Sequence, residues 1–131
     1  MGLFGKKVKR DSNGYIDVEV KLLISWDEPN GEGCIVSDRI TRDGYKVGYM
    51  VREEPLTGQP DSGWRFYSGD EDQAYSNDPR NHAVFALNTI CNYDPDIIPF
   101  LHSPVGSAFI RTGRDSLVSD DGTGTIKVYK Q

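Results

Sequence analysis

The sequence predicts an α+β domain: a single antiparallel, strongly twisted sheet with a few short helices between a central hairpin and the C-terminal strands. Two observations carry this prediction. Apolar and polar residues alternate with a period of two in several short segments, which is typical of strands that bury one face. Between the last of these segments, acidic residues and an Asp-Pro pair follow the pattern of helix N-termini.

The N-terminal part is expected to hold a tail and two strands. Residues 1–13 contain four Lys or Arg and end in a turn-rich stretch, so we expect a flexible basic tail before a single domain at 14–131. Alternation is clearest at 16–26, which predicts the first strand. A short apolar run at 34–36 predicts the second strand.

The next two strands form the predicted central hairpin. Residues 45–52 and 64–68 alternate, and the loop between them, at 53–63, holds two prolines and two glycines. Trp64 and Phe66 fall on one face of the return strand, where they would form the aromatic centre of the sheet.

Two short helices are expected after the hairpin. Carboxylates at 70–72 suit the N-terminus of a helix that reaches Tyr75, because they face the positive end of the helix dipole. Asp94 followed by Pro95 has the form of an N-cap with proline in the first helical position, and this helix would reach about Leu101.

Three segments complete the expected order of elements. Residues 84–93 fit a strand or a helix equally well, and the pattern does not choose between them. Alternation then predicts strands at 107–111 and, after a glycine-rich turn at 122–124, at 125–130.

The charge balance narrows the class of partner. Fifteen Lys and Arg against twenty Asp and Glu give a net charge of −5, which disfavours nucleic acid and favours a basic protein partner. No apolar run approaches the roughly 20 residues of a bilayer span, so we expect no membrane-spanning helix. The N-terminus lacks the pattern of a secretory signal, which predicts a cytoplasmic protein.

The residues that usually carry catalysis or metal binding do not form a recognisable pattern. Cys34 and Cys91 lie far apart and are interpreted as core residues, with a disulfide between them as the alternative. His82 and His102 lack metal-ligand spacing, and a thiol–imidazole pair with Cys91 is the less favoured interpretation. We therefore predict no catalytic residues, no metal, no cofactor and no enzymatic activity.

The acidic group at 70–72, with Asp94 and Asp96 further along the chain, has three interpretations. It could hold a divalent cation, but its spacing matches no EF-hand loop. Helix capping on a solvated acidic face is the favoured interpretation. A patch that meets a cationic partner is the third, and the sequence leaves the last two open.

The partner-binding candidates combine this acidic group with exposed aromatic and arginine side chains of the hairpin. On a strand only alternate residues enter the core, so the others remain available for binding. Tyrosine and arginine are enriched at protein interfaces. The predicted partner-binding residues are Tyr45, Arg65, Tyr67, Asp70, Glu71 and Asp72.

Several strings of residues resemble one known family. They are Gly44–Met50, Arg52–Pro55, Asp61–Phe66, Ser68–Asp72, Asn88–Ile90, Tyr93–Pro99 and Pro104–Phe109, written here by their first and last residues. In this order they resemble the type thirty-three immunity-protein-like domains of bacteria, formerly a domain of unknown function. The resemblance covers about residues 33–111.

The resemblance implies a bacterial cytoplasmic protein that binds and neutralises the toxin of a polymorphic toxin system. The family brings no catalytic residues to carry over. The residues that match its motifs and are interpreted as serving the fold are Gly48, Gly63, Trp64, Gly69, Asp94 and Pro95.

Three functions are therefore weighed for the chain. The first is an immunity-type inhibitor that binds a basic toxin domain. The second is a small-ligand-binding protein or an enzyme with a site near Trp64 and the acidic turn at 70–72. The third is a general interaction domain unrelated to toxins. The sequence does not indicate the oligomeric state.

Overall fold

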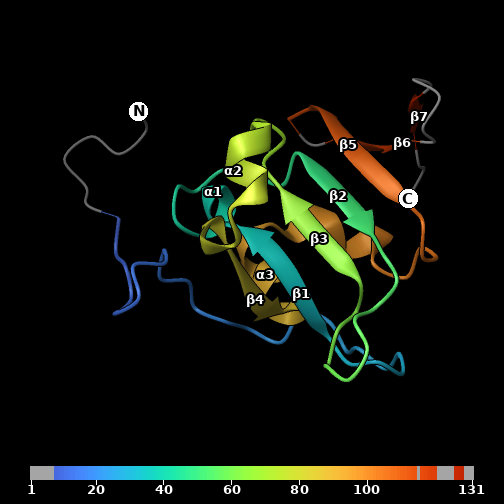
Figure 1. Ribbon diagram of the computed structural model, residues 1–131, viewed down its shortest axis with the longest axis horizontal. Helices are drawn as coiled ribbons and strands as arrows, with labels where there is room; N and C mark the ends of the chain where they lie inside the picture. Colours follow the sequence, from blue (N-terminus) through green and yellow to red (C-terminus); the bar gives the residue numbers. More distant parts are fainter. Residues whose placement is uncertain (1–7, 115, 121–125, 129–131) are drawn as a thin grey trace.

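One mixed β-sheet forms the frame of the molecule (Figure 1). The computed structural model describes residues 8–114, 116–120 and 126–128. In these residues the sheet has seven strands in the order β4-β1-β3-β2-β5-β6-β7. The strands are β1 (Gly33–Ser37), β2 (Tyr49–Arg52), β3 (Trp64–Tyr67), β4 (His82–Ala86), β5 (Ala108–Gly113), β6 (Ser116–Asp120) and β7 (Ile126–Val128).

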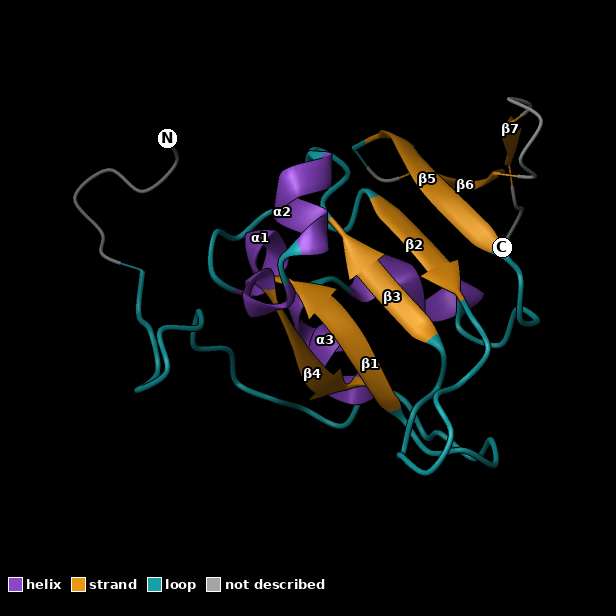
Figure 2. Cartoon of the chain, in the orientation of Figure 1, coloured by secondary structure: helices purple, strands orange, loops and turns teal. Residues whose placement is uncertain are grey.

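Short helices connect the strands and cover one face of the sheet (Figure 2). The α-helices are α1 (Asp38–Thr41), α2 (Gln73–Asn77) and α3 (Leu87–Tyr93), and the 3₁₀ helices are η1 (Pro79–Asn81) and η2 (Pro95–Phe100). Helix α3 lies behind the sheet in Figure 2, whereas α2 lies at one end of the strands. The α+β class is confirmed, as is the position of most helices between the hairpin and the C-terminal strands.

The predicted purely antiparallel sheet is wrong at one pair of strands. Strands β1 and β3 run parallel, with Ile35 beside Arg65 and Val36 beside Phe66. Strand β3 follows β2 in the chain but lies between β1 and β2 in the sheet. Strand β2 runs opposite to β1, and β3 pairs antiparallel with β2, so β3 runs in the same direction as β1.

The central hairpin is confirmed and supplies the middle of the core. Met50 on β2 lies opposite Phe66 on β3, and Phe109 on β5 lies opposite Met50. These three side chains and Trp64 are fully buried, and the Trp64 indole N–H donates to the Leu101 carbonyl at 2.9 Å. Alternation along β3 thus places Trp64 and Phe66 on the face that packs against the helices, and the other two residues of β3 on the opposite face.

Asp94 caps η2 as predicted and also ties that helix to the sheet. Its carboxylate accepts a hydrogen bond from the Asp96 amide at 3.0 Å, from the Val47 amide at 2.9 Å and from Arg111 at 2.9 Å. Asp94 is 1% exposed, so this carboxylate is compensated by buried donors from three segments.

The strand predicted at 16–26 is wrong. Apart from an isolated bridge at Ile16, this segment pairs with no strand among the described residues, and Leu22 is 86% exposed. The side-chain amides of Asn88 and Asn92 on α3 bond the backbone of Lys21, and Asn88 also accepts from Leu23. Because helix side chains satisfy this backbone, the alternating segment crosses the helix without joining the sheet.

The remaining elements differ from the sequence predictions as follows. The ambiguous segment 84–93 is divided between β4 and α3, and strand β6 was not predicted. Strand β7 falls within the predicted 125–130, of which residues 125, 129 and 130 lie outside the described residues. In the predicted tail, residues 1–7 also lie outside them, and Arg10 bridges Ile16.

The interpretation of both cysteines as core residues is confirmed. Cys34 and Cys91 are free thiols in the buried cluster, at 1% and 0% exposure. Burial raises the pKa of the Cys91 thiol to about 11 and raises that of Cys34 as well. Both sulfurs therefore remain protonated near neutral pH, which is unfavourable for a nucleophile.

The network around Asp94 gives a first prediction. Replacing Asp94→Ala leaves Arg111 and the buried Val47 amide without this acceptor, and should lower the free energy of unfolding by roughly 3 kcal/mol. The matched control is Asp96→Ala, whose more exposed carboxylate pairs with Lys46 and Arg111 and should cost about 1 kcal/mol. Urea unfolding of both variants measures the difference, and equal losses would contradict the role given to Asp94.

Candidate functional site

The face of the sheet opposite α3 carries a hollow that we call the open-face groove. Alternation places Tyr49 of β2, Tyr67 of β3 and Ile110 of β5 side by side on this face. The groove has a volume of about 1010 Å³. Its lining combines these strands with the turn after β3 and includes the side chains of Tyr45, Tyr49, Glu53, Tyr67, Asp70 and Glu71.

Two tyrosines form the floor of the groove. The rings of Tyr49 and Tyr67 stack with centroids 6.0 Å apart and planes 30° from parallel. Burial raises the pKa of both phenols, and the Glu53 carboxylate raises them further. Both hydroxyls thus stay protonated as donors and acceptors, while their ring faces offer apolar contact and attraction for a cation.

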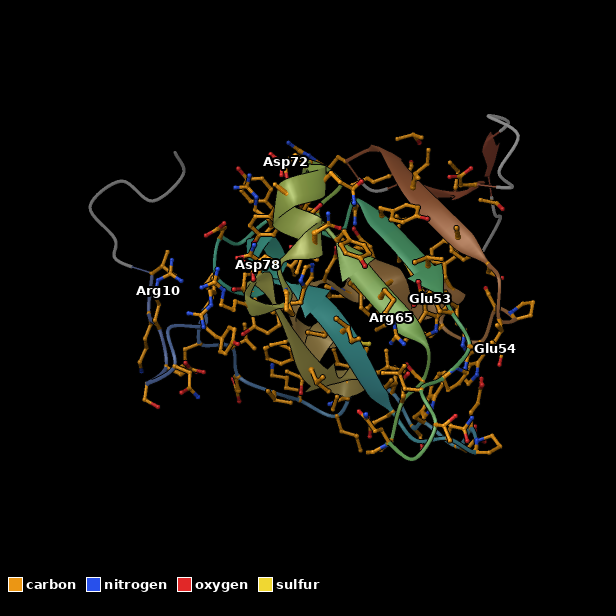
Figure 3. All side chains as sticks on the ribbon, viewed as in Figure 1. Arg10, Glu53, Glu54, Arg65, Asp72 and Asp78 are labelled. Carbon is orange, nitrogen blue, oxygen red and sulfur yellow. The ribbon has the colours of Figure 1, made fainter. Side chains whose placement is uncertain are left out.

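Arg65, predicted as a partner-binding residue, lies beneath the surface with its charge compensated. It is 4% exposed, and its guanidinium donates to both oxygens of Asp61 at 2.9 and 2.8 Å. Its Nε atom donates to Glu53 at 3.1 Å, and Figure 3 shows these two side chains together on the open face. A second hollow of about 370 Å³, which shares Glu53 and Tyr67 with the groove, reaches Arg65.

Arg65 positions the Glu53 side chain at the site. The Glu53 side chain remains 57% exposed at the edge of the groove, although one carboxylate oxygen is held by Arg65. A fixed, solvent-facing carboxylate beside two tyrosine rings is a favourable environment for a guanidinium or ammonium group. The structure thus adds Glu53 and Tyr49 to the predicted residues, and strand alternation in the sequence is the signal that points to Tyr49.

The three carboxylates of the acidic turn have different roles. Glu71 accepts from the Ser68 and Gly69 amides at 2.8 and 2.9 Å. Burial alone would raise the pKa of Glu71, but hydrogen bonds from the Ser37 hydroxyl and these amides outweigh it and lower the pKa. Asp72 caps α2 by accepting from the Tyr75 amide at 2.8 Å. Capping is therefore confirmed for Asp72, and Glu71 holds the turn together.

Asp70 is the member of this turn most available to a partner. Its carboxylate accepts from the Ser68 hydroxyl and lies 3.5 Å from Arg39, and about half of its side chain is exposed. Arg39 also lies over the rings of Tyr45 and Tyr75, at 5.4 and 5.5 Å. Tyr45 and Asp70 thus form one end of the groove, joined through Arg39.

Two of the family-motif glycines, Gly48 and Gly63, allow close backbone approaches around the groove. Gly63 has a φ of +90°, and a Cβ atom there would collide with the Glu53 carbonyl. A Cβ atom at Gly48 would collide with the Ser68 carbonyl, where β2 and the acidic turn approach closely. Trp64 is wholly buried on the other face of the sheet, so its indole does not reach the groove.

Neither histidine forms a pair with a cysteine in the contacts of the described residues. His102 stacks on Trp26 and contacts Glu28 at 2.7 Å, whereas His82 lies edge-on to Tyr67. Among the described residues no group of three His, Cys, Asp or Glu could hold a metal ion. In the same residues no helix has the length and apolar character needed to span a bilayer.

The architecture places a polar and aromatic hollow on the sheet face opposite α3, with Ser76 of α2 at its border. The chain belongs to the Immunity protein Imm33 domain family, whose model matches residues 34–120. The match runs from β1 to β6 and includes the whole groove. Proteins of immunity families are generally non-enzymatic and act on a protein partner. No curated protein and no solved structure matches the chain.

The ion pair beneath the groove gives a second prediction. Hydrogen bonds from Arg65, opposed by burial and assisted by the Leu56 and Gly63 amides, lower the pKa of Asp61 from 3.8 to about 2. A carboxylate with a lower pKa in the folded state stabilises the fold above about pH 4, and this contribution is lost as the pH falls toward 2. Asp61→Asn should therefore cost about 2 kcal/mol of unfolding free energy at pH 7 and progressively less below pH 4.

Urea unfolding between pH 2 and pH 7 measures this difference. The control is Asp78→Asn, since the pKa of Asp78 is also lowered to about 2, through hydrogen bonds with Arg80. Asp78 is a surface residue whose ion pair is screened by water, so its replacement should change stability much less. A loss for Asp61→Asn that does not depend on pH would contradict the assignment.

Proposed function

We propose that this protein is an immunity-type inhibitor that neutralises a cognate toxin by binding it at the open-face groove. The observation that carries the proposal is that the groove unites four of the six predicted partner-binding residues from separate segments. These four are Tyr45, Tyr67, Asp70 and Glu71. The immunity family supports a protein partner, and the groove, at about 1010 Å³, is larger than the neighbouring hollow of about 370 Å³.

The charges around the groove favour a basic partner. Lys46 and Arg111 also line it; both are paired with Asp96, Arg111 pairs with Asp94 in addition, and Lys46 keeps 52% of its side chain exposed. Glu53 and Asp70 keep substantial exposure at the rim. The net charge of −5 would attract a basic toxin domain over a longer range and accelerate association.

The proposed inhibition needs no chemistry from this chain. A toxin side chain such as arginine or lysine would lie between the tyrosine rings and the Glu53 carboxylate, which combines cation–π attraction with a charged hydrogen bond. Occupying the groove would cover the toxin surface that carries this side chain. The proposal includes a bacterial polymorphic toxin system and a cytoplasmic location, as the family resemblance implies.

A small organic cation is the second candidate ligand, and the stacked tyrosines beside Glu53 favour it. Such a ligand would use the groove, since Trp64 lies on the opposite face. A purified small cation that raises the melting temperature at micromolar concentration would support this candidate. Binding of a toxin, without any such effect of a small cation, would support the inhibitor function. A partner that is not a toxin would instead support a general interaction domain.

The proposal gives a third prediction, on association with the toxin. The toxin is identified by capture from a lysate of the producing bacterium with the wild-type chain, and its activity is then titrated with this chain. Asp70→Lys should slow association about tenfold at low ionic strength and reduce its dependence on salt, because a carboxylate at the rim is reversed. Surface plasmon resonance with the purified toxin measures both rates.

The matched control is Glu19→Lys, which changes the net charge equally at an exposed position outside the groove lining. Its association rate should fall much less than that of Asp70→Lys. Equal rates for the two variants would reject the groove as the site of steering. A captured toxin whose activity is unchanged by an excess of the wild-type chain would reject the inhibitor function itself.

A further inference from the structure

Strand β4 ends the sheet on the side away from β7, and one of its edges is without a neighbouring strand among the described residues. It pairs with β1 in antiparallel register, Gly33 with Ala86 through Ser37 with His82. An edge of this kind presents backbone donors and acceptors to solvent and is a template for pairing with another chain.

The register shows which groups face outward. The Leu87 amide donates to the Glu32 carbonyl at 2.9 Å, which extends the same register by one residue. Hydrogen-bonded and non-bonded pairs alternate along an antiparallel ladder, so Phe85 and Ala83 are the next residues that bond β1. His82, Val84 and Ala86 therefore direct their backbone polar groups away from the sheet.

Two of these outward groups already have partners. The His82 amide donates to Pro79, and Ala86, as the N-cap of α3, provides the carbonyl of the first helical hydrogen bond. No backbone or side-chain bond within the described residues uses the others. The free set is the His82 carbonyl, both groups of Val84 and the Ala86 amide.

This set is complementary to itself. When two copies of β4 lie antiparallel with Val84 opposite Val84, each Val84 amide faces the other Val84 carbonyl. Each Ala86 amide then faces the His82 carbonyl of the other copy, because His82 lies opposite Ala86 in this register. All four outward groups of each strand find a partner, and none that is already bonded is needed.

The side chains and flanking charges agree with this arrangement. Strand β4 contains no charged residue and no proline, the usual features that protect an edge, and Val84 is 70% exposed. Arg80, just before the strand, is 88% exposed in its side chain but is held by Asp78 at 2.8 Å, so this flanking pair leaves no unpaired charge beside the edge.

We propose that two copies of this chain associate through β4, antiparallel and with a two-fold axis at Val84, to form one continuous sheet. Residues opposite each other in such a pair lie on the same face, so both open faces lie on one side. The two grooves would then face a partner together, and a partner with two sites would gain avidity. The association itself does not depend on the proposed function.

The pairing is expected to be weak, because five-residue strand edges bury much less than the area of a stable interface. Sedimentation equilibrium up to about 1 mM protein should show the mass rising from one chain toward two. Val84→Lys places two like charges opposite each other at the axis and should abolish this rise. Val105→Lys is the control, at a residue that is exposed in a loop, and should leave the rise unchanged.

A second measurement tests the register. Directly opposite residues have Cα atoms about 5.5 Å apart, so Val84→Cys should be linked between chains by a short bifunctional maleimide. Val105→Cys should not be linked, and Cys34 and Cys91 are buried. Thermal unfolding confirms that each variant is folded. A wild-type chain that remains monomeric at the highest concentration, or equal linking of both cysteine variants, would overturn the proposal.

Discussion

The organisation of the sheet depends on the compensated charge of Arg65 in its central strand. An arginine that is 4% exposed is unfavourable unless its donors are occupied, and Asp61 and Glu53 occupy them. Asp61 also accepts from the Leu56 and Gly63 amides, so the same carboxylate orders the hairpin loop. The ion pair therefore fixes the β2–β3 hairpin and the orientation of Glu53 beside the groove.

The alternation of β3 then separates the two faces of the molecule. Trp64 and Phe66 enter a core closed by α3 and η2, whereas Tyr67 faces outward beside Tyr49. In the acidic turn that follows, the carboxylates of Glu71 and Asp72 accept hydrogen bonds from backbone amides, so their role is to stabilise the local backbone. Asp70, which has only side-chain partners, combines with the tyrosines in the surface that we propose for toxin binding.

Sequence patterns predicted the elements whose partners are local. The capping group at 70–72 and the Asp94 cap depend on residues within three positions of one another, and both are confirmed. The hairpin, which pairs two strands consecutive in the chain, is confirmed as well. The strand at 16–26 was wrong because alternation predicts an extended, amphipathic backbone without specifying its neighbour. Here the neighbour is a helix, whose Asn88 and Asn92 amides take the place of a strand.

The sequence by itself determined the α+β class, the family and the acidic balance, and it pointed to four of the residues that line the groove. It did so because composition, capping and alternation are properties of short segments. Only the tertiary structure decided that β3 lies parallel to β1, that Arg65 is buried and that β4 has a free edge. Each of these depends on which distant segments become neighbours, and no local pattern encodes that choice.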